Sequence, residues 1–147
     1  MRLVIQRSNN ASVTVDDKVV GKINSGLVIL VGFTEGDTEE IIDKMVNKVI
    51  NLRIFDDEDG VMNRSLLDVG GSILSISQFT LYADTRKGRR PSYIKALRGE
   101  ESIILYDKWN ENLRKTGITI ATGIFGADMQ VSLINDGPIT IVMDSEE

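Results

Sequence analysis

The chain has 147 residues, of which 41% are apolar, 27% charged and 5% aromatic, and its formal net charge is −5. These proportions are typical of one globular domain, and a chain of this length can bury a core without staples. It contains no cysteine and no histidine, which excludes disulfides, thiolate nucleophiles, Ser-His-Asp catalysis and zinc sites built from these ligands. An enzyme of this composition must use carboxylates, hydroxyls, amides, Lys, Arg, backbone groups, or a group that its substrate brings.

Residues 1–8 lack the charged and apolar regions of a secretory signal, and no apolar run reaches the roughly 18 residues that a membrane span needs. We therefore expect a cytoplasmic protein that makes no membrane contact.

The N-terminal part of the chain is predicted to form strands and then a helix. Segments rich in Val, Ile and Thr, separated by Asn, Asp, Gly and Ser, predict strands at Arg2–Arg7, Ala11–Asp16, Val19–Ile23 and Leu27–Phe33. Asp37 and Glu40 then resemble a capping box, and apolar residues at helical spacing from Ile41 to Ile50 predict an amphipathic helix.

A further strand at Leu52–Phe55 leads into four consecutive acidic residues at positions 56–59. We interpret these residues as an exposed hairpin turn. A metal site is the less favoured alternative, because the turn lacks the alternating spacing and distal Glu of a calcium-binding hand.

The C-terminal half repeats the alternation of strands and helices. Ser72–Leu81 predicts a strand, and a helix from about Glu100 to Lys115 ends near Gly117. Three more strands are predicted at Ile118–Ala121, Met129–Ile134 and Ile139–Met143. This order of elements predicts a mixed α/β domain whose neighbouring strands are largely antiparallel.

Positive charge is concentrated between Asp84 and Arg98, which hold six Lys or Arg residues and one Asp. The segment thus carries +5 and the rest of the chain −10. Such a distribution allows contact with a polyanion at one place and repulsion elsewhere. A solvated basic loop is the alternative.

Three motifs are candidates for chemistry, each with a plainer alternative. Strand alternation over residues 75–80 would put Ser75, Ser77 and Phe79 on one face and Ile76, Gln78 and Thr80 on the other; the alternative is a strand with a polar face. Residues 135–138, Asn-Asp-Gly-Pro, read as a hairpin turn. Residues 122–127 form a Gly-spaced loop whose spacing does not fit a dinucleotide-binding site, and the alternative is a simple connection between strands.

Five blocks carry a combined signal: Arg2–Arg7 with Ala11–Val13, Ser77–Ala83, Lys87–Ser92, Thr122–Met129 and Asn135–Thr140. In this order they make the chain resemble the D-aminoacyl-tRNA deacylase family from end to end. The resemblance implies layered, largely antiparallel β-sheets in a β/β/α arrangement, with two main helices packed outside. It also implies that residues 1–147 form a single domain.

The resemblance implies an enzyme that cleaves the ester between a D-amino acid and the 3′ end of tRNA, and that also accepts glycyl-tRNA. The ribose 2′-hydroxyl beside this labile ester can assist its hydrolysis, so the protein mainly positions and desolvates the ester and stabilises the oxyanion. No histidine, metal or cofactor is then needed. The implied partners are tRNA and a second copy in a homodimer, with no DNA and no membrane.

The resemblance also implies roles for single residues. Gly137 and Pro138 would form a cis peptide that enters the active site of the partner subunit and rejects L-amino acids, and Arg7 would orient their carbonyls. The catalytic pocket would be formed by Ser77, Gln78, Phe79 and Thr80. Of these, Thr80 is interpreted as a positioning or packing residue, because no base is available to activate its hydroxyl.

Two further sets are implied to bind RNA. Phe125 and Met129 would contact the terminal adenosine, with core packing as the alternative. The phosphates of tRNA would be bound by Arg86, Lys87, Arg89, Arg90 and Lys95.

Two rival functions remain open from the sequence. A non-catalytic RNA-binding module would use the same basic segment but would protect the ester instead of turning it over. A general small-ester hydrolase with Ser77 or Thr80 as its nucleophile would cleave esters that contain no RNA.

Overall fold

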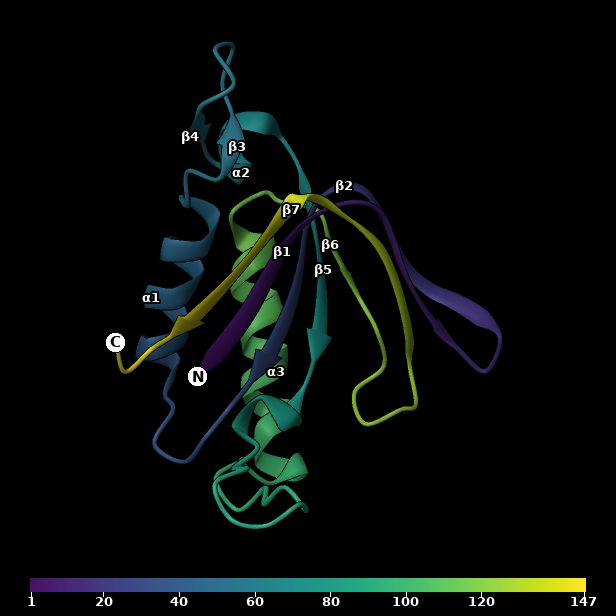
Figure 1. The fold of residues 1–147 in the computed structure, drawn as a ribbon, viewed down its shortest axis with the longest axis vertical. Helices are drawn as coiled ribbons and strands as arrows, with labels where there is room; N and C mark the ends of the chain where they lie inside the picture. Colours follow the sequence, from purple (N-terminus) through teal and green to yellow (C-terminus); the bar gives the residue numbers. More distant parts are fainter.

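The computed structural model describes all residues from Met1 to Glu147. Five strands form one sheet in the order β6-β5-β2-β1-β7, and two short strands form a second sheet (Figure 1). The strands are β1 (Arg2–Val15), β2 (Lys18–Gly32), β3 (Phe55–Asp56), β4 (Met62–Arg64), β5 (Ser72–Ser77), β6 (Ile120–Thr122) and β7 (Gln130–Asp144). The long strands β1, β2 and β7 pair antiparallel, whereas β5 and β6 add to the edge of β2 in parallel.

Two long helices, α1 (Glu39–Ile50) and α3 (Gly99–Lys115), pack side by side against the sheet (Figure 1). The main core lies between them and the sheet and includes Leu3, Ile29, Ile42 and Trp109. Two short helical turns, α2 (Leu66–Val69) and η1 (Phe79–Tyr82), flank β5. No helix is long and apolar enough to cross a membrane.

A second, smaller core lies on the other face of the same sheet. Ala11 and Val13 from β1 and Ile23 from β2 contact Leu74 and Ile76 of β5. Successive residues of a strand face opposite sides of a sheet, so Leu74 and Ile76 face away from Ile73 of the main core. The mixed α/β fold, with two main helices outside, is as the sequence predicts.

The four strands predicted near the N-terminus are in fact two. The turn between them is at Asp16 and Asp17, which adopt positive φ angles of 48° and 63°. The Asn-rich segments that suggested further turns stay within the strands: Asn10, at φ 48°, lies where the register of β1 against β7 shifts. Asn tolerates this backbone region better than most residues, so the long strand absorbs an irregularity instead of ending.

The predicted hairpin at residues 135–138 is also wrong, because β7 is continuous. Gln6 pairs with Thr140 and Ser8 pairs with Asn135. Only Arg7 separates the two β1 residues, whereas residues 136–139 separate their partners. The Gly-Pro motif is therefore a bulge in β7 directly opposite Arg7.

Smaller differences concern where elements begin and end. β5 stops at Ser77, so the predicted strand alternation does not extend to Thr80. Of the predicted strand at Leu52–Phe55, only Phe55 pairs. The acidic hairpin turn is confirmed, since the Asp57 carboxylate accepts hydrogen bonds from the backbone N–H groups of Asp59 and Val61.

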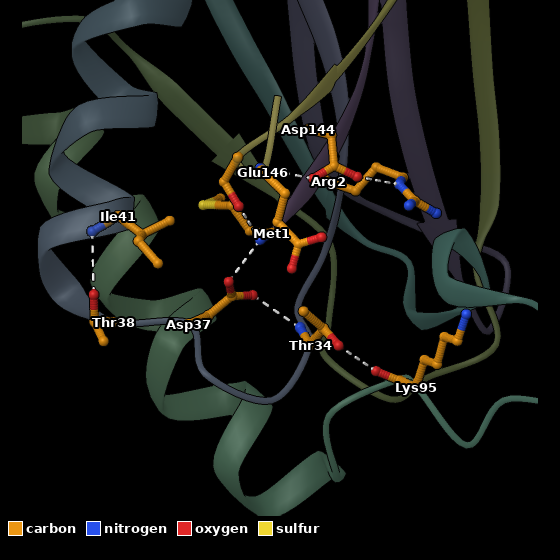
Figure 2. Close-up of polar contacts among 10 residues, drawn as sticks. Met1, Arg2, Thr34, Asp37, Thr38, Ile41, Lys95, Asp144 and Glu146 are labelled. Carbon is orange, nitrogen blue, oxygen red and sulfur yellow. Dashed lines mark hydrogen bonds and ion pairs between the residues drawn. The ribbon is translucent and has the colours of Figure 1, made fainter.

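Helix α1 is capped by Thr38, whose hydroxyl accepts from the Ile41 N–H at 3.3 Å, and not by Asp37 as predicted (Figure 2). Asp37 is instead the centre of a partly buried polar cluster. Its carboxylate accepts from the N-terminal ammonium of Met1 at 2.6 Å and from the Thr34 N–H at 2.8 Å. The Thr34 hydroxyl donates to the Lys95 carbonyl at 2.6 Å (Figure 2). The cluster thus ties β1 and α1 to the basic segment.

We expect Asp37→Asn to lower the free energy of unfolding by about 3 kcal/mol, because removing one partner of a buried ion pair leaves the other charge uncompensated. The side chains of this pair, Met1 and Asp37, are only 0% and 4% exposed. Urea denaturation measures the effect. Glu39→Gln is the matched control, since Glu39 pairs with Lys108 at the surface and should change stability by less than about 1 kcal/mol. Equal effects of both substitutions would contradict the role assigned to Asp37.

Candidate active site

A cavity of about 550 Å³ opens where β5 ends. Its floor is formed by the ends of two neighbouring parallel strands, with Val31 and Gly32 from β2 and Ile76 and Ser77 from β5. In open α/β sheets ligands bind outside the carboxyl ends of the strands. The other lining residues are Gln78, Phe79, Tyr93, Ala96, Leu97, Gly99, Ser102, Phe125, Gly126, Ala127, Met129 and Val131.

The junction between β5 and η1 shapes the cavity floor. The Gln78 N–H donates to the Val31 carbonyl at 2.8 Å, and the Leu81 N–H donates to the Gln78 carbonyl at 3.3 Å. The N–H groups of Phe79 and Thr80 precede this first bond of η1 and therefore have no partner within the helix. The junction offers two backbone donors beside the Ser77 and Gln78 side chains.

Thr80 does not line the cavity, but its side chain contacts Gln78. Its hydroxyl oxygen accepts from the Gln78 side-chain amide at 2.6 Å. The contact fixes the Gln78 amide at the edge of the floor.

Helical turn η1 is also braced from β1. The Arg2 guanidinium donates to the Leu81 carbonyl at 2.7 Å and lies 4.6 Å from the centre of the Tyr82 ring. Asp144 of β7 accepts from Arg2 Nε at 2.9 Å. Strands β1 and β7 and helical turn η1 are thus tied together.

One wall of the cavity is fixed to β5 through Tyr106. The Tyr106 ring packs against Phe125, with 5.7 Å between ring centres, and its hydroxyl donates to the Ser75 carbonyl at 2.8 Å. Trp109 donates to the Ser75 hydroxyl at 3.3 Å. Burial raises the pKa of the Tyr106 phenol, which keeps its hydroxyl a donor. Phe125 and the strand that carries Ser77 therefore keep a fixed separation.

The chemistry that the cavity offers is neutral. No Asp, Glu, Lys or Arg lines it, and Tyr93 is its only titratable residue. No cluster of three or more carboxylates in the chain is placed to hold a metal ion. Reaction in this cavity would depend on hydroxyls, amides, backbone N–H groups and groups of the substrate.

Arg7, Gly137 and Pro138 form a separate site, and none of them lines the cavity. The Gly137–Pro138 peptide bond is cis, and both residues are exposed. Arg7 is buried beneath the bulge, where it pairs with the Asp136 carboxylate at 3.1 Å and donates to the Asp136 carbonyl at 3.3 Å. Gly137 has φ 126°, a conformation that favours glycine.

Two residues that sequence reasoning missed hold this bulge. The Asn135 side chain donates to the carbonyls of Arg7 and Ile139, at 3.1 and 3.0 Å, and so closes the bulge at its base. Asp56, from the acidic hairpin, lies 3.4 Å from the Arg7 guanidinium. Nothing local in the sequence links Asp56 to Arg7, because the contact depends on how the hairpin packs.

The predicted RNA-binding cations differ in whether they form ion pairs. Asp84 forms a two-point ion pair with Arg86 and lies 3.9 Å from Lys95. The remaining cations of the set, Lys87, Arg89 and Arg90, are exposed and form no ion pair. The segment that carries them continues into Tyr93, Ala96 and Leu97, which form a cavity wall.

The structure thus brings part of the predicted site together. The cavity is lined by Ser77, Gln78, Phe79, Phe125 and Met129. Thr80 lies just outside it, and the Arg7 bulge lies elsewhere on the same chain. Sequence reasoning missed Tyr93, although an aromatic residue among basic ones is itself a signal for nucleic-acid binding.

Comparison with known proteins extends these observations. Residues 4–144 match the family described as D-Tyr-tRNA(Tyr) deacylase. The D-aminoacyl-tRNA deacylase of Bacillus velezensis is 56% identical over 147 residues, which is 100% of both chains. The D-aminoacyl-tRNA deacylase of Thermus aquaticus is 54% identical, over 100% of this chain and 97% of that protein.

Solved structures agree with the fold. The structure described as "c-Myc DNA Unwinding Element Binding Protein" matches with a TM-score of 0.92 and 40% identity, over 98% of each chain. A probable eukaryotic D-amino acid tRNA deacylase matches with a TM-score of 0.85 over 97% of each chain. At 18% identity, this second match bears on the fold alone.

The fold and the cavity define an α/β protein with an uncharged, ligand-sized site at the carboxyl end of a parallel strand. Within that class, the chain belongs to the D-Tyr-tRNA(Tyr) deacylase family. The resemblance seen in the sequence is confirmed.

The ion pair in the basic segment predicts a pH dependence. Hydrogen bonds from Arg86 hold the pKa of the Asp84 carboxyl well below its usual range. Because the folded pKa is lowered, the ionised carboxylate stabilises the fold of this segment above the unfolded pKa of about 3.9, and the contribution is lost as pH falls through the lowered folded value.

An NMR titration of the Asp84 carboxyl should therefore find it ionised at about pH 3.5. In Arg86→Ala the carboxyl should titrate closer to its usual range, whereas Lys87→Ala, which removes a neighbouring charge that does not touch Asp84, should leave the midpoint nearly unchanged. The same midpoint in Arg86→Ala as in the unaltered protein would show that Arg86 is not the cause.

Proposed function

We propose that this protein is a cytoplasmic aminoacyl-tRNA editing hydrolase that releases the D-amino acid from D-aminoacyl-tRNA. The observation that carries the proposal is the neutral cavity at the end of β5, bordered by a basic segment, in a chain of the deacylase family. The cavity would take the aminoacylated terminal adenosine, and the basic segment would meet the phosphates of the acceptor end.

The catalytic proposal follows from what the cavity lacks. No lining side chain is a base at neutral pH, so the ribose 2′-hydroxyl of the substrate supplies the assistance that a histidine gives elsewhere. The backbone N–H of Phe79, which lines the cavity, has no partner within η1 and suits the oxyanion that develops on the ester carbonyl. Phe125 and Met129 offer an aromatic face and a soft thioether to the adenine base.

Selection against L-amino acids is assigned to the bulge opposite Arg7. Gly137 and Pro138 are exposed and do not line the cavity of their own chain, so in a homodimer they would enter the cavity of the partner subunit. Their carbonyls would face the α-carbon of the substrate and leave no room for an L side chain. A D side chain would project outward, so many D-amino acids and glycine would be accepted.

The rigidity that such selection requires is consistent with the contacts of the bulge. Arg7 and Asn135 hold its base through four carbonyl and carboxylate contacts. A Cβ on Gly137 would lie 2.8 Å from the Ile139 side chain and 3.0 Å from the Ile139 nitrogen. A wall of backbone held in this way can reject a methyl group that a loose loop would admit.

The test is the steady-state release of amino acid from D-tyrosyl-tRNA and L-tyrosyl-tRNA at catalytic protein concentration. We expect many turnovers per dimer on the D ester and no turnover on the L ester. In Gly137→Ala we expect the D/L ratio to fall at least ten-fold, because the backbone at Gly137 must move.

Two results would contradict the proposal. Binding of tRNA without turnover of either ester would leave the chain as an RNA-binding module. Turnover of simple esters that contain no RNA, abolished by Ser77→Ala or Thr80→Ala, would identify a general ester hydrolase.

A further inference from the structure

Three exposed apolar side chains belong to η1 and the basic segment. Phe79 is 56% exposed, Tyr93 is 41% exposed and Ile94 is 87% exposed. The Phe79 and Tyr93 rings pack edge to face, with 5.2 Å between their centres. We call Phe79, Tyr93 and Ile94 the apolar rim. Side chains of this size are rarely left in water without a partner when they are grouped.

The apolar rim lies at the mouth of the cavity. Phe79 and Tyr93 contribute part of their surface to its lining, whereas Ile94 does not line it. One side of the rim is therefore continuous with the proposed adenosine pocket, and the other side faces outward. Any ligand chain that leaves the cavity here passes over the rim.

The backbone that presents the rim is held on both sides. Before it, Asp84 and Ser92 exchange two backbone hydrogen bonds of 2.8 and 2.9 Å. After it, the Lys95 carbonyl accepts from the Thr34 hydroxyl at 2.6 Å, and the Leu97 N–H donates to the Phe33 carbonyl at 3.0 Å. The rim is thus ordered before a ligand arrives, which reduces the entropy cost of binding.

The charges around the rim bear on the class of ligand that it can bind. Arg89, Arg90 and Lys95 surround it along the chain, and the first two form no ion pair. Apolar and aromatic faces among cations are what single-stranded RNA requires, because its bases stack while its phosphates meet Lys and Arg. A protein partner that binds through apolar contacts would not require this concentration of positive charge.

We propose that the apolar rim is a second nucleotide subsite, which stacks the base of the penultimate nucleotide of tRNA. The proposal rests on the proposed function, in which the aminoacylated terminal adenosine occupies the cavity. A cavity of about 550 Å³ is of the size that holds one small ligand. The next nucleotide must therefore lie outside, where the exposed faces of Tyr93 and Ile94 begin.

The test compares two D-tyrosyl esters, one of adenosine alone and one of an RNA trinucleotide that ends in adenosine. The ratio of their KM values isolates the nucleotides outside the cavity, because both substrates share everything inside it. In Tyr93→Ser we expect the KM of the trinucleotide ester, relative to that of the adenosine ester, to rise about ten-fold, in the range found for base stacking. In Ile94→Ser we expect a smaller rise than in Tyr93→Ser, because an aliphatic side chain contacts a base without stacking on it.

Ile104→Ser is the matched control. Ile104 is also an exposed isoleucine, at 67%, but it lies on α3 and does not line the cavity. The KM ratio should not change in this variant. An unchanged ratio in Tyr93→Ser, or a change in the oligomeric state of Ile94→Ser measured by sedimentation, would overturn the proposal.

A binding measurement separates this proposal from the proposed function. Fluorescence anisotropy of a labelled, uncharged RNA trinucleotide should give about ten-fold weaker binding for Tyr93→Ser than for the unaltered protein, whether or not esters are turned over. If no ester is hydrolysed but this loss is found, the hydrolase assignment fails and the subsite stands. Equal binding by both proteins overturns the subsite.

Discussion

The site depends on one backbone hydrogen bond, from the Gln78 N–H to the Val31 carbonyl, at 2.8 Å. It is the last bond between β2 and β5, and beyond it the chain leaves the sheet for η1. Because the strand stops there, Ser77 and Gln78 line a cavity instead of continuing the pairing with β2. The N–H groups of Phe79 and Thr80 are left without partners in the helix. Gly32 permits this approach, since a Cβ there would lie 2.9 Å from the Gln78 carbonyl.

The remaining structure holds three walls against this floor. Tyr106 links Phe125 to Ser75, and Arg2 fixes the end of η1. Thr34, which is bound to Asp37, holds the Lys95 carbonyl next to the wall that Tyr93, Ala96 and Leu97 form. The interior of the site stays neutral while the positive charge is kept on the outer segment. This separation suits the proposed substrate, because its phosphates would be attracted to the surface and its labile ester bond would be held where water and protein charges are few.

The sequence predicts what depends on local pattern and misses what depends on register and packing. Apolar periodicity predicts both α1 and α3, and the basic segment is visible as a run of charge. The continuity of β1 and β7 was missed, because Asn10 and Gly137 look like turn residues but lie in irregular long strands. Arg7 faces the bulge because β1 pairs with β7, which lies some 130 positions further along the chain. No local pattern in the sequence predicts this pairing. The helix cap was missed for a similar reason. Asp37 accepts a hydrogen bond from the Met1 ammonium, a contact that depends on packing, and Thr38 caps the helix instead.

In the proposed function, the chain supplies position and polarity while the RNA supplies the reactive hydroxyl. The most direct test is the single-turnover rate on D-tyrosyl-tRNA whose terminal adenosine carries 2′-hydrogen in place of the 2′-hydroxyl, compared with the ribose form. If this division of roles holds, the 2′-hydrogen form reacts at least about 100-fold more slowly, since that is the usual contribution of a positioned proton-transfer group, and the tRNA still binds. An equal rate on both substrates would contradict it, and would require a nucleophile or base from the protein itself.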